Sequence, residues 1–301
     1  MKQEVKACMD VFAKGDFRAA ETGRILCALC PRHCALGKGE TGACAARWNP
    51  DGRIVSKNYG QVTSLALDPI EKKPLRHFHP GRLILSVGSF GCNLFCPFCQ
   101  NAELSRAGAG DASTRYLSPE ALTALAAQLA AEHGNLGVAF TYNEPLVGIE
   151  YVMDTARLLK EKHLDVVLVT NGQIAPEPLE PLLPLVDAWN IDLKGFTQVY
   201  YDWLGGSLET VKHTVERAAA SGAEVEVTTL VVPGKNDSAE DMEREAAWLA
   251  SISVDLPLHI TRYFPRYRCE IPETPRETIE RLVTVAQSYL HHVYRGNLSS
   301  E

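Results

Sequence analysis

The chain has 301 residues, of which 46% are hydrophobic and 22% are charged. That composition is ordinary for a globular protein, and the length can form one large core, as in many single-domain α/β barrels. The formal net charge of −7 disfavours general nucleic-acid binding, which needs a basic surface. No uncharged apolar run of about 18 residues occurs, so we expect no membrane span. The first residues lack the apolar core of a signal peptide, and we therefore expect a cytoplasmic location.

The N-terminal part is rich in cysteine. After a predicted short helical lead-in over residues 1–22, four cysteines fall within eighteen residues, separated by glycines that permit tight turns. Nine cysteines without an export signal favour metal or redox chemistry over disulfides. A small module this poor in apolar residues needs a bound ion to hold its shape. We therefore predict a Cys-rich metal-binding module over residues 1–60. Its candidate ligands are Cys27, Cys30, Cys34 and Cys44.

The spacing of these four cysteines does not identify the ion. Zinc would be purely structural, whereas a second iron–sulfur cluster could pass electrons. Reduced cysteines without an ion are the remaining alternative. His33 could replace one thiolate, although we interpret it as a surface side chain. Two further cysteines, Cys8 and Cys269, stand alone and are interpreted as buried thiols.

Residues 60–82 carry several prolines, glycines and cations. Prolines and glycines break regular structure, so we predict a long ordered loop before the first barrel strand. Its cations could hold an acidic partner or a carboxylate, or could belong to a solvated charged loop. His77 and His79 alternate along the chain, but alone they do not predict a metal site.

A second cysteine cluster follows a short apolar run at residues 83–87, which we predict as a buried strand. Cys92, Cys96 and Cys99 stand at the spacing Cys-x3-Cys-x2-Cys. Three thiolates on one loop suit a [4Fe–4S] cluster with one open iron, because cysteine sulfur holds such clusters. No fourth cysteine follows nearby, as it would in an ordinary ferredoxin. The alternatives are a structural zinc site, which would need a fourth ligand, or three unrelated buried thiols.

From residue 118 onward, helical and strand patterns alternate. Ser118 predicts a helix start because serine caps the free N–H groups of the first turn, and Gly134 predicts its end. Six strands counted from residues 83–87 indicate parallel strands with right-handed crossovers, as in a barrel or an open doubly wound sheet. The other strands are predicted near residues 137–140, 165–169, 188–194, 224–232 and 257–261, with a short terminal strand at 292–294.

Polar residues gather where these strands end. In α/β barrels the chemistry lies at the carboxyl ends of the strands. Buried polar groups are costly unless they are paired, so a bound polar ligand would account for them. The residues predicted at this ligand site are Asn143, Glu144, Thr170, Asn171, Asp192, Lys194, Thr228 and His259.

The Cys92–Cys96–Cys99 loop resembles the signature loop of the radical S-adenosylmethionine (SAM) enzymes. This resemblance implies a partial (β/α)6 TIM-like barrel over residues 61–301, with SAM bound through its amino and carboxylate groups to the open iron. Phe98 stands where that family places an aromatic residue against the adenine. The stretch 141–145 looks like a variant of the family's Gly-Gly-Glu-Pro, which suggests that Glu144 receives the SAM ammonium.

Asp192 and Lys194 are similar to the Asp-x-Lys pair of glycyl-radical-enzyme activases, where both lie near SAM or the substrate backbone. The alternative for these side chains is an ion pair or a cap at the barrel rim. One departure weakens the transfer of the activase function. The activases carry an arginine where this chain has residues 228–230. The cationic contact of that arginine is therefore missing here, unless Arg262 or Lys194 replaces it.

Taken over nearly its whole length, the chain resembles the radical SAM component of the AmmeMemoRadiSam system, which is similar to pyruvate formate-lyase activating enzymes. The resemblance implies an enzyme that reductively cleaves SAM to a 5′-deoxyadenosyl radical and abstracts hydrogen from an unidentified substrate. A flavodoxin or ferredoxin would supply the electron, and Memo-like and AMMECR-like proteins or a protein substrate would be partners. The alternatives are a glycyl-radical-enzyme activase and an iron–sulfur electron-transfer or scaffold protein without SAM chemistry. The segments that carry the resemblance are the four-cysteine head, 68–74, the cluster loop, 141–145, 192–195 and 294–297.

Overall fold

The computed structural model describes residues 23–298, so Cys8 and the lead-in predicted for residues 1–22 lie outside the described residues. Within this range the largest sheet has eight strands, in the spatial order β14-β13-β12-β11-β10-β9-β7-β6. Neighbours from β7 to β14 run parallel, whereas β6 pairs antiparallel with β7 at one edge. The strands are β6 (Ser64–Pro69), β7 (Leu83–Gly88), β9 (Asn135–Phe140), β10 (Asp165–Thr170), β11 (Ala188–Asp192), β12 (Glu224–Val231), β13 (Leu258–Arg262) and β14 (Val293–Gly296).

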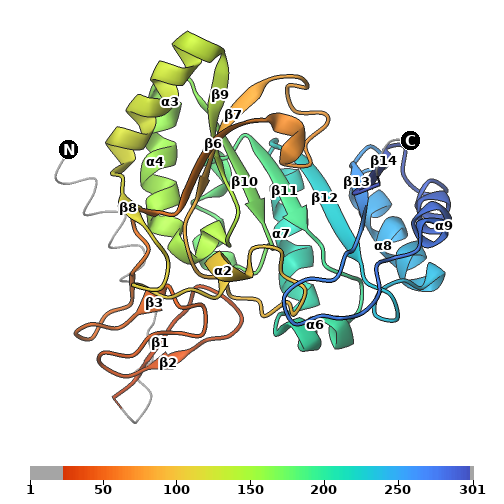
Figure 1. The fold of residues 1–301 in the computed structure, drawn as a ribbon, viewed down its shortest axis with the longest axis horizontal. Helices are drawn as coiled ribbons and strands as arrows, with labels where there is room; N and C mark the ends of the chain where they lie inside the picture. The colour runs from red at the N-terminus through yellow and green to blue at the C-terminus, as the bar shows by residue number, and fades with distance from the viewer. Residues whose placement is uncertain (1–22, 299–301) are drawn as a thin grey trace.

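The predicted alternation of strands and helices is confirmed. The first long helix begins after Ser118, whose side chain accepts the N–H of Ala121, and ends at Gly134 with a left-handed φ of 68°. Figure 1 shows α3 and α4 beside β9 and β10, and α8 and α9 toward β13 and β14. No helix within residues 23–298 is long and apolar enough to cross a membrane. The longer helices are α3 (Pro119–His133), α4 (Ile149–Glu161), α7 (Leu208–Ala220), α8 (Ala239–Ile252) and α9 (Arg276–Ala286), and the shorter ones are α2 (Ala102–Ser105), α5 (Pro176–Leu179) and α6 (Gln198–Leu204).

The prediction that residues 60–82 form only a loop is wrong. Strand β6 occupies Ser64–Pro69 and pairs along its whole length with β7, which buries Asp68 in the barrel. The helical turn η1 (Ile70–Lys72) follows directly. The prolines lie at the end of β6 and beyond it, where they do not interrupt its hydrogen bonds, so the first half of this segment is free to form an edge strand.

The second half of that segment, residues 70–82, crosses the amino ends of the strands inside the barrel. Leu75 is fully buried against interior residues of β7, β9 and β10. The backbone N–H groups of Arg76 and His77 donate to Glu226 of β12, and the His77 ring lies 2.7 Å from the Tyr294 hydroxyl of β14. This segment therefore fills the amino end of the open barrel, and the cavity described below lies toward the carboxyl end.

The described part of the N-terminal module consists of small antiparallel pairs joined by tight turns. Figure 1 shows it as the red and orange hairpins below α4, on the side where α2 lies. The predicted boundary at residue 60 stays a prediction. The pairs are β1 (Ile25–Leu26) with β2 (Ala35–Leu36), and β3 (Arg47–Trp48) with β4 (Val55–Ser56), while β5 (Gln61–Val62) pairs with β8 (Arg115–Tyr116) of the following segment.

Candidate functional site

A cavity of about 370 Å³ lies at the carboxyl ends of the parallel strands. The loop after β7 forms one wall, and the ends of β9 to β13 form the others. Eleven of the residues predicted at the site line this cavity, although they come from five different strand ends. These residues are Cys92, Cys96, Phe98, Cys99, Asn143, Glu144, Thr170, Asn171, Asp192, Lys194 and Thr228.

The cluster loop, residues 89–101, brings Cys92, Cys96 and Cys99 to the cavity as free thiols. Within residues 23–298, no three His, Cys, Asp or Glu side chains are already arranged to hold a metal ion. Burial raises the pKa of the Cys96 thiol to about 11 and raises that of Cys92 further. Thiolates would therefore need a positively charged centre beside them. Three free thiols on one loop, facing a hollow of this size, are a donor set that fits a [4Fe–4S] cluster.

Asn143 holds the start of the cluster loop. Its side-chain oxygen accepts the Ser89 N–H at 2.9 Å, and its amide nitrogen lies 3.1 Å from the carbonyl oxygens of Phe90 and Gly91. Because these bonds occupy the side chain, Asn143 positions the loop through its amide group.

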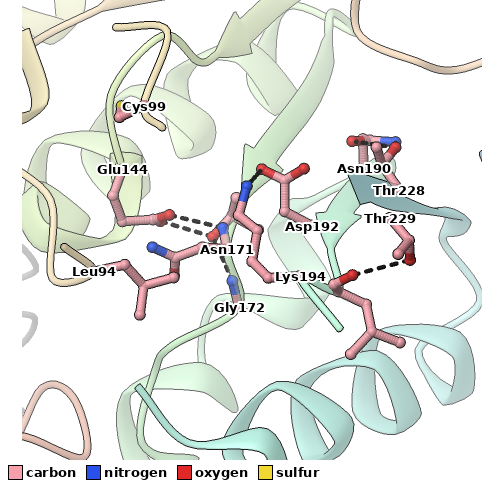
Figure 2. A network of polar contacts seen from close by, with 12 residues as sticks. Leu94, Cys99, Glu144, Asn171, Gly172, Asn190, Asp192, Lys194, Thr228 and Thr229 are labelled. Atoms are coloured by element: carbon pink, nitrogen blue, oxygen red, sulfur yellow. Dashed lines mark hydrogen bonds and ion pairs between the residues drawn. The ribbon is translucent and has the colours of Figure 1, made fainter. Parts of the chain in front are cut away.

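Glu144 is 3% exposed, and its carboxylate is surrounded by donors. It accepts the Thr170 hydroxyl at 2.7 Å, the Asn171 N–H at 2.8 Å and the Leu146 N–H at 3.0 Å. Figure 2 shows the carboxylate directed toward Asn171. Burial raises its pKa to about 7, although these hydrogen bonds act in the opposite direction. A cation entering the cavity would favour the ionised carboxylate.

Asp192 and Lys194 form an ion pair at the end of β11, with 2.8 Å between the carboxylate and the ammonium. Figure 2 shows the two side chains lying against each other. Burial alone would lower the pKa of Lys194, but the charges of Asp192 and Cys96 outweigh it and raise the pKa. Lys194 therefore stays a cation beside the thiols at neutral pH.

Phe98 lies in an aromatic group beside the cavity. Its ring centroid is 5.7 Å from that of Trp203 on α6 and 6.1 Å from that of Tyr263, which follows β13. Only 3% of Phe98 is exposed, yet it contributes to the cavity wall. The loop thus presents an apolar surface next to its thiols.

The structure does not bring His259 to the cavity wall. It lies near the start of β13, and its Nε2 atom is 2.5 Å from the buried Glu226 carboxylate. Thr261, two residues further along the same face, lines the cavity instead. Since alternate residues share one face of a strand, His259 has the predicted direction but lies too deep in the barrel. Thr228 does line the cavity, and its hydroxyl is paired with the Asn190 side chain, 3.0 Å away.

Sequence reasoning missed part of the cavity wall. Lys72, Tyr142 and Asn297 also line the cavity. Asp68 organises this side, because it accepts hydrogen bonds from Lys72 at 3.1 Å and from the Tyr142 hydroxyl at 3.0 Å. The acidic and basic residues of the stretch 68–74 are the available signal in the sequence, although the prolines and glycines of residues 60–82 predict a loop.

The four N-terminal cysteines surround a separate, much smaller hollow of about 10 Å³. Cys27, Cys30 and Cys44 are buried, and Cys34 is partly exposed. The predicted ligand residues are thus brought together, but whether they bind an ion stays a prediction.

These features define a class of protein: an α/β barrel enzyme with a thiol-lined ligand cavity at the carboxyl ends of its strands. The Radical SAM superfamily model matches residues 86–248, more than half of the chain, and the chain belongs to this superfamily. Enzymes of the superfamily use a [4Fe–4S] cluster and SAM.

Similar proteins extend this result. The uncharacterized protein MJ0808 of Methanocaldococcus jannaschii is 37% identical over 285 residues, covering 94% of this chain and 84% of that protein. The FeMo cofactor biosynthesis protein NifB of Klebsiella pneumoniae is 27% identical over 204 residues, covering 59% of this chain and 43% of NifB. The SAM-bound crystal structure of Streptococcus suis SuiB superposes with a TM-score of 0.56 at 14% identity, covering 77% of this chain and 53% of SuiB, and supports the fold alone.

Proposed function

We propose that this enzyme reductively cleaves SAM and abstracts a hydrogen atom from a substrate held in the 370 Å³ cavity. The observation that carries the proposal is the convergence of three free thiols, a buried carboxylate and an aromatic ring on one cavity at the carboxyl ends of the strands. When bound, the cluster supplies the electron that splits the SAM sulfonium into methionine and a 5′-deoxyadenosyl radical.

In this proposal Cys92, Cys96 and Cys99 hold the cluster, and the other wall residues hold SAM. Glu144 offers a carboxylate to the SAM ammonium, because burial and three donors fix its position. Phe98 offers an apolar face to the adenine. Asp192 and Lys194 offer one charge of each sign, which suits the ribose hydroxyls and the carboxylate of SAM. Asn171, Thr170 and Thr228 complete the polar wall.

The proposed substrate side is the part of the cavity wall that Lys72, Thr261 and Asn297 form. These residues are far from the cluster loop in sequence. Lys72 is partly neutralised by Asp68 but is 66% exposed, so its ammonium is accessible to a substrate. A polar or anionic substrate group would match this wall.

Activation of a glycyl-radical enzyme is the alternative, and the structure gives it no added support. Arg262 could have replaced the activases' missing arginine, but it pairs with Glu273 and the Thr274 carbonyl and does not line the cavity. Lys194 is engaged with Asp192. The partners that we propose from the sequence resemblance are a flavodoxin or ferredoxin and Memo-like or AMMECR-like proteins. We also propose an ion at the four N-terminal cysteines.

The decisive experiment uses anaerobically purified protein, reconstituted with iron and sulfide and incubated with SAM and dithionite. The wild type should form 5′-deoxyadenosine, and Cys96→Ala should form none because the cluster loses one of three ligands. Glu209→Gln, at an exposed side chain on α7, is the control and should keep the activity. A cluster-loaded wild type that forms no 5′-deoxyadenosine would instead favour an electron-transfer or scaffold protein.

A further inference from the structure

The hollow between the four N-terminal cysteines is small enough to restrict what can occupy it. Its volume of about 10 Å³ is close to that needed for one water molecule. A single metal ion could occupy this space if the thiols turned toward it. A cube of four irons and four sulfides would force the surrounding walls apart. Zn²⁺ is the ion that four cysteine thiolates commonly hold in a closed tetrahedral site.

Arg47 shows independently that this hollow is built for negatively charged sulfur. The side chain lines the hollow, is 4% exposed, and pairs with the Glu150 carboxylate at 2.7 Å. Its Nε atom is nevertheless buried without a hydrogen-bond partner among the described residues. An unpaired buried donor is costly. Thiolates that ligate an ion would supply a hydrogen-bond acceptor for the Arg47 Nε–H group, whereas the protonated thiols supply none.

The turns around the hollow already direct donors at the sulfur atoms. The backbone N–H of Arg47 lies 3.4 Å from the Cys44 sulfur, and the N–H groups of Leu29 and Arg32 face Cys27 and Cys30. The Cys27 N–H also donates to the Cys34 carbonyl at 2.9 Å, which holds these two ligands side by side. Backbone donors thus face three of the four sulfur atoms, where thiolates ligating an ion would accept their hydrogen bonds.

We infer that the four N-terminal cysteines hold one zinc-type dication, and that this ion fixes the backbone of the cluster loop. The second part rests on the proposed function, in which that loop holds the [4Fe–4S] cluster. The Cys44 carbonyl accepts the N–H of Cys92 at 3.2 Å. From the Cys30 turn, the Arg32 Nε atom donates to the Asn93 carbonyl at 2.8 Å. Two of the four ligand turns therefore contact the cluster loop directly.

The coupling follows from the energetics of metal binding. Structural zinc sites contribute their binding free energy to folding, because the ordered site does not exist without the ion. The two ligand turns that the ion would order are the same turns that hold Cys92 and Asn93. Loss of the ion should therefore release the cluster loop on the side of the N-terminal module, even though no zinc ligand enters the 370 Å³ cavity.

The first test counts metals in the full chain after reconstitution with iron, sulfide and zinc. We expect one zinc and about four irons per wild-type chain. Cys34→Ala should lose its zinc, Cys34→His should retain it because imidazole also binds zinc, and Cys269→Ala, which removes a thiol outside the N-terminal hollow, should keep its zinc. About eight irons and no zinc in the wild type would overturn the inference but leave the proposed function intact. Full zinc in Cys34→Ala would also overturn it.

The second test follows amide hydrogen exchange in the iron-free full chain, so its result does not depend on SAM chemistry. Adding zinc should slow exchange in residues 27–47 and, by about tenfold or more, at the Cys92 amide, since that amide donates to Cys44. Cys34→Ala should show neither change. Protection confined to residues 27–47 would show that the ion does not fix the cluster loop.

Discussion

The two cysteine clusters of this chain differ less in their cysteines than in the walls around them. The cluster loop faces a cavity of about 370 Å³ with carboxylates, two ammonium groups and hydroxyl groups. The four N-terminal cysteines enclose about 10 Å³, with Arg47 as the buried charge. An open site has space for a ligand that reacts, whereas a closed one has space for an ion that only holds the chain. The surrounding walls thus indicate the chemistry better than the thiol spacing does.

The two clusters also touch, and Gly91 lies at their contact. Its φ is +90°, and a Cβ atom there would lie 2.6 Å from the Cys44 carbonyl oxygen. Gly91→Ala should therefore push the N-terminal module and the cluster loop apart. We expect a loss of about 3 kcal/mol or more in unfolding free energy, from backbone strain plus steric overlap. After reconstitution and desalting, Gly91→Ala should also contain much less iron than the wild type. Urea unfolding and iron analysis measure the two effects.

Gly110→Ala is the matched control, because Gly110 has a φ of +97° and open space around its Cβ position. It should cost only the backbone strain of about 1–2 kcal/mol and leave the iron content unchanged. Equal losses in both variants would mean that the contact between the two clusters contributes nothing.

The next largest effect concerns the polar wall of the large cavity, which has no counterpart in the N-terminal hollow. Glu144→Gln removes the buried negative charge proposed to receive the SAM ammonium. The dissociation constant for SAM should rise by about 10- to 100-fold at pH 8, as expected for the loss of a charged hydrogen bond. Glu209→Gln, at an 80% exposed side chain on α7, should leave the affinity unchanged. Titration of the iron-loaded protein with SAM gives the comparison.

The same carboxylate predicts a pH dependence. Burial raises the pKa of Glu144 to about 7, so the proton competes with the SAM ammonium below that pH. SAM should bind about tenfold more weakly at pH 6 than at pH 8, because most of the carboxyl group is protonated at pH 6. Glu144→Gln should remove this dependence. A wild-type affinity that is constant from pH 6 to 8 would show that the pKa of Glu144 lies below this range in the iron-loaded protein.

Local signals in the sequence were sufficient for the helix at residues 118–134 and for the edge of the sheet where the cavity lies. The helix between Ser118 and Gly134 was predicted correctly because its caps bond to their own first and last turns. The cluster loop and Glu144 were predicted to share a site because parallel strands place their carboxyl ends together. The structure brings these side chains to one cavity.

Long-range contacts account for what was missed. Residues 70–82 fill the barrel because Glu226, about 150 positions away, accepts the backbone N–H groups of Arg76 and His77. The same carboxylate holds His259 below the cavity. Neither of these two contacts of Glu226 is accompanied by a periodic pattern in the sequence from which it could be predicted. The size of the N-terminal hollow also could not be predicted from the sequence, because it depends on how the turns pack against Arg47.

The smallest predicted effect tests the contact between the two clusters through one side chain. The Phe95 ring, 40% exposed, lies between two guanidinium groups: Arg32 of the N-terminal module at 4.3 Å and Arg106 of the barrel at 4.5 Å. Arg32→Ala removes one cation–π contact and the hydrogen bond to Asn93, together about 1–2 kcal/mol. Iron loss to a chelator should then be several-fold faster, with zinc still bound. Arg32→Lys should recover only part of this, because a lysine keeps the charge without the planar, directed contact. If Arg106→Ala accelerates iron loss while Arg32→Ala does not, the Arg32 side chain contributes nothing to holding the cluster loop.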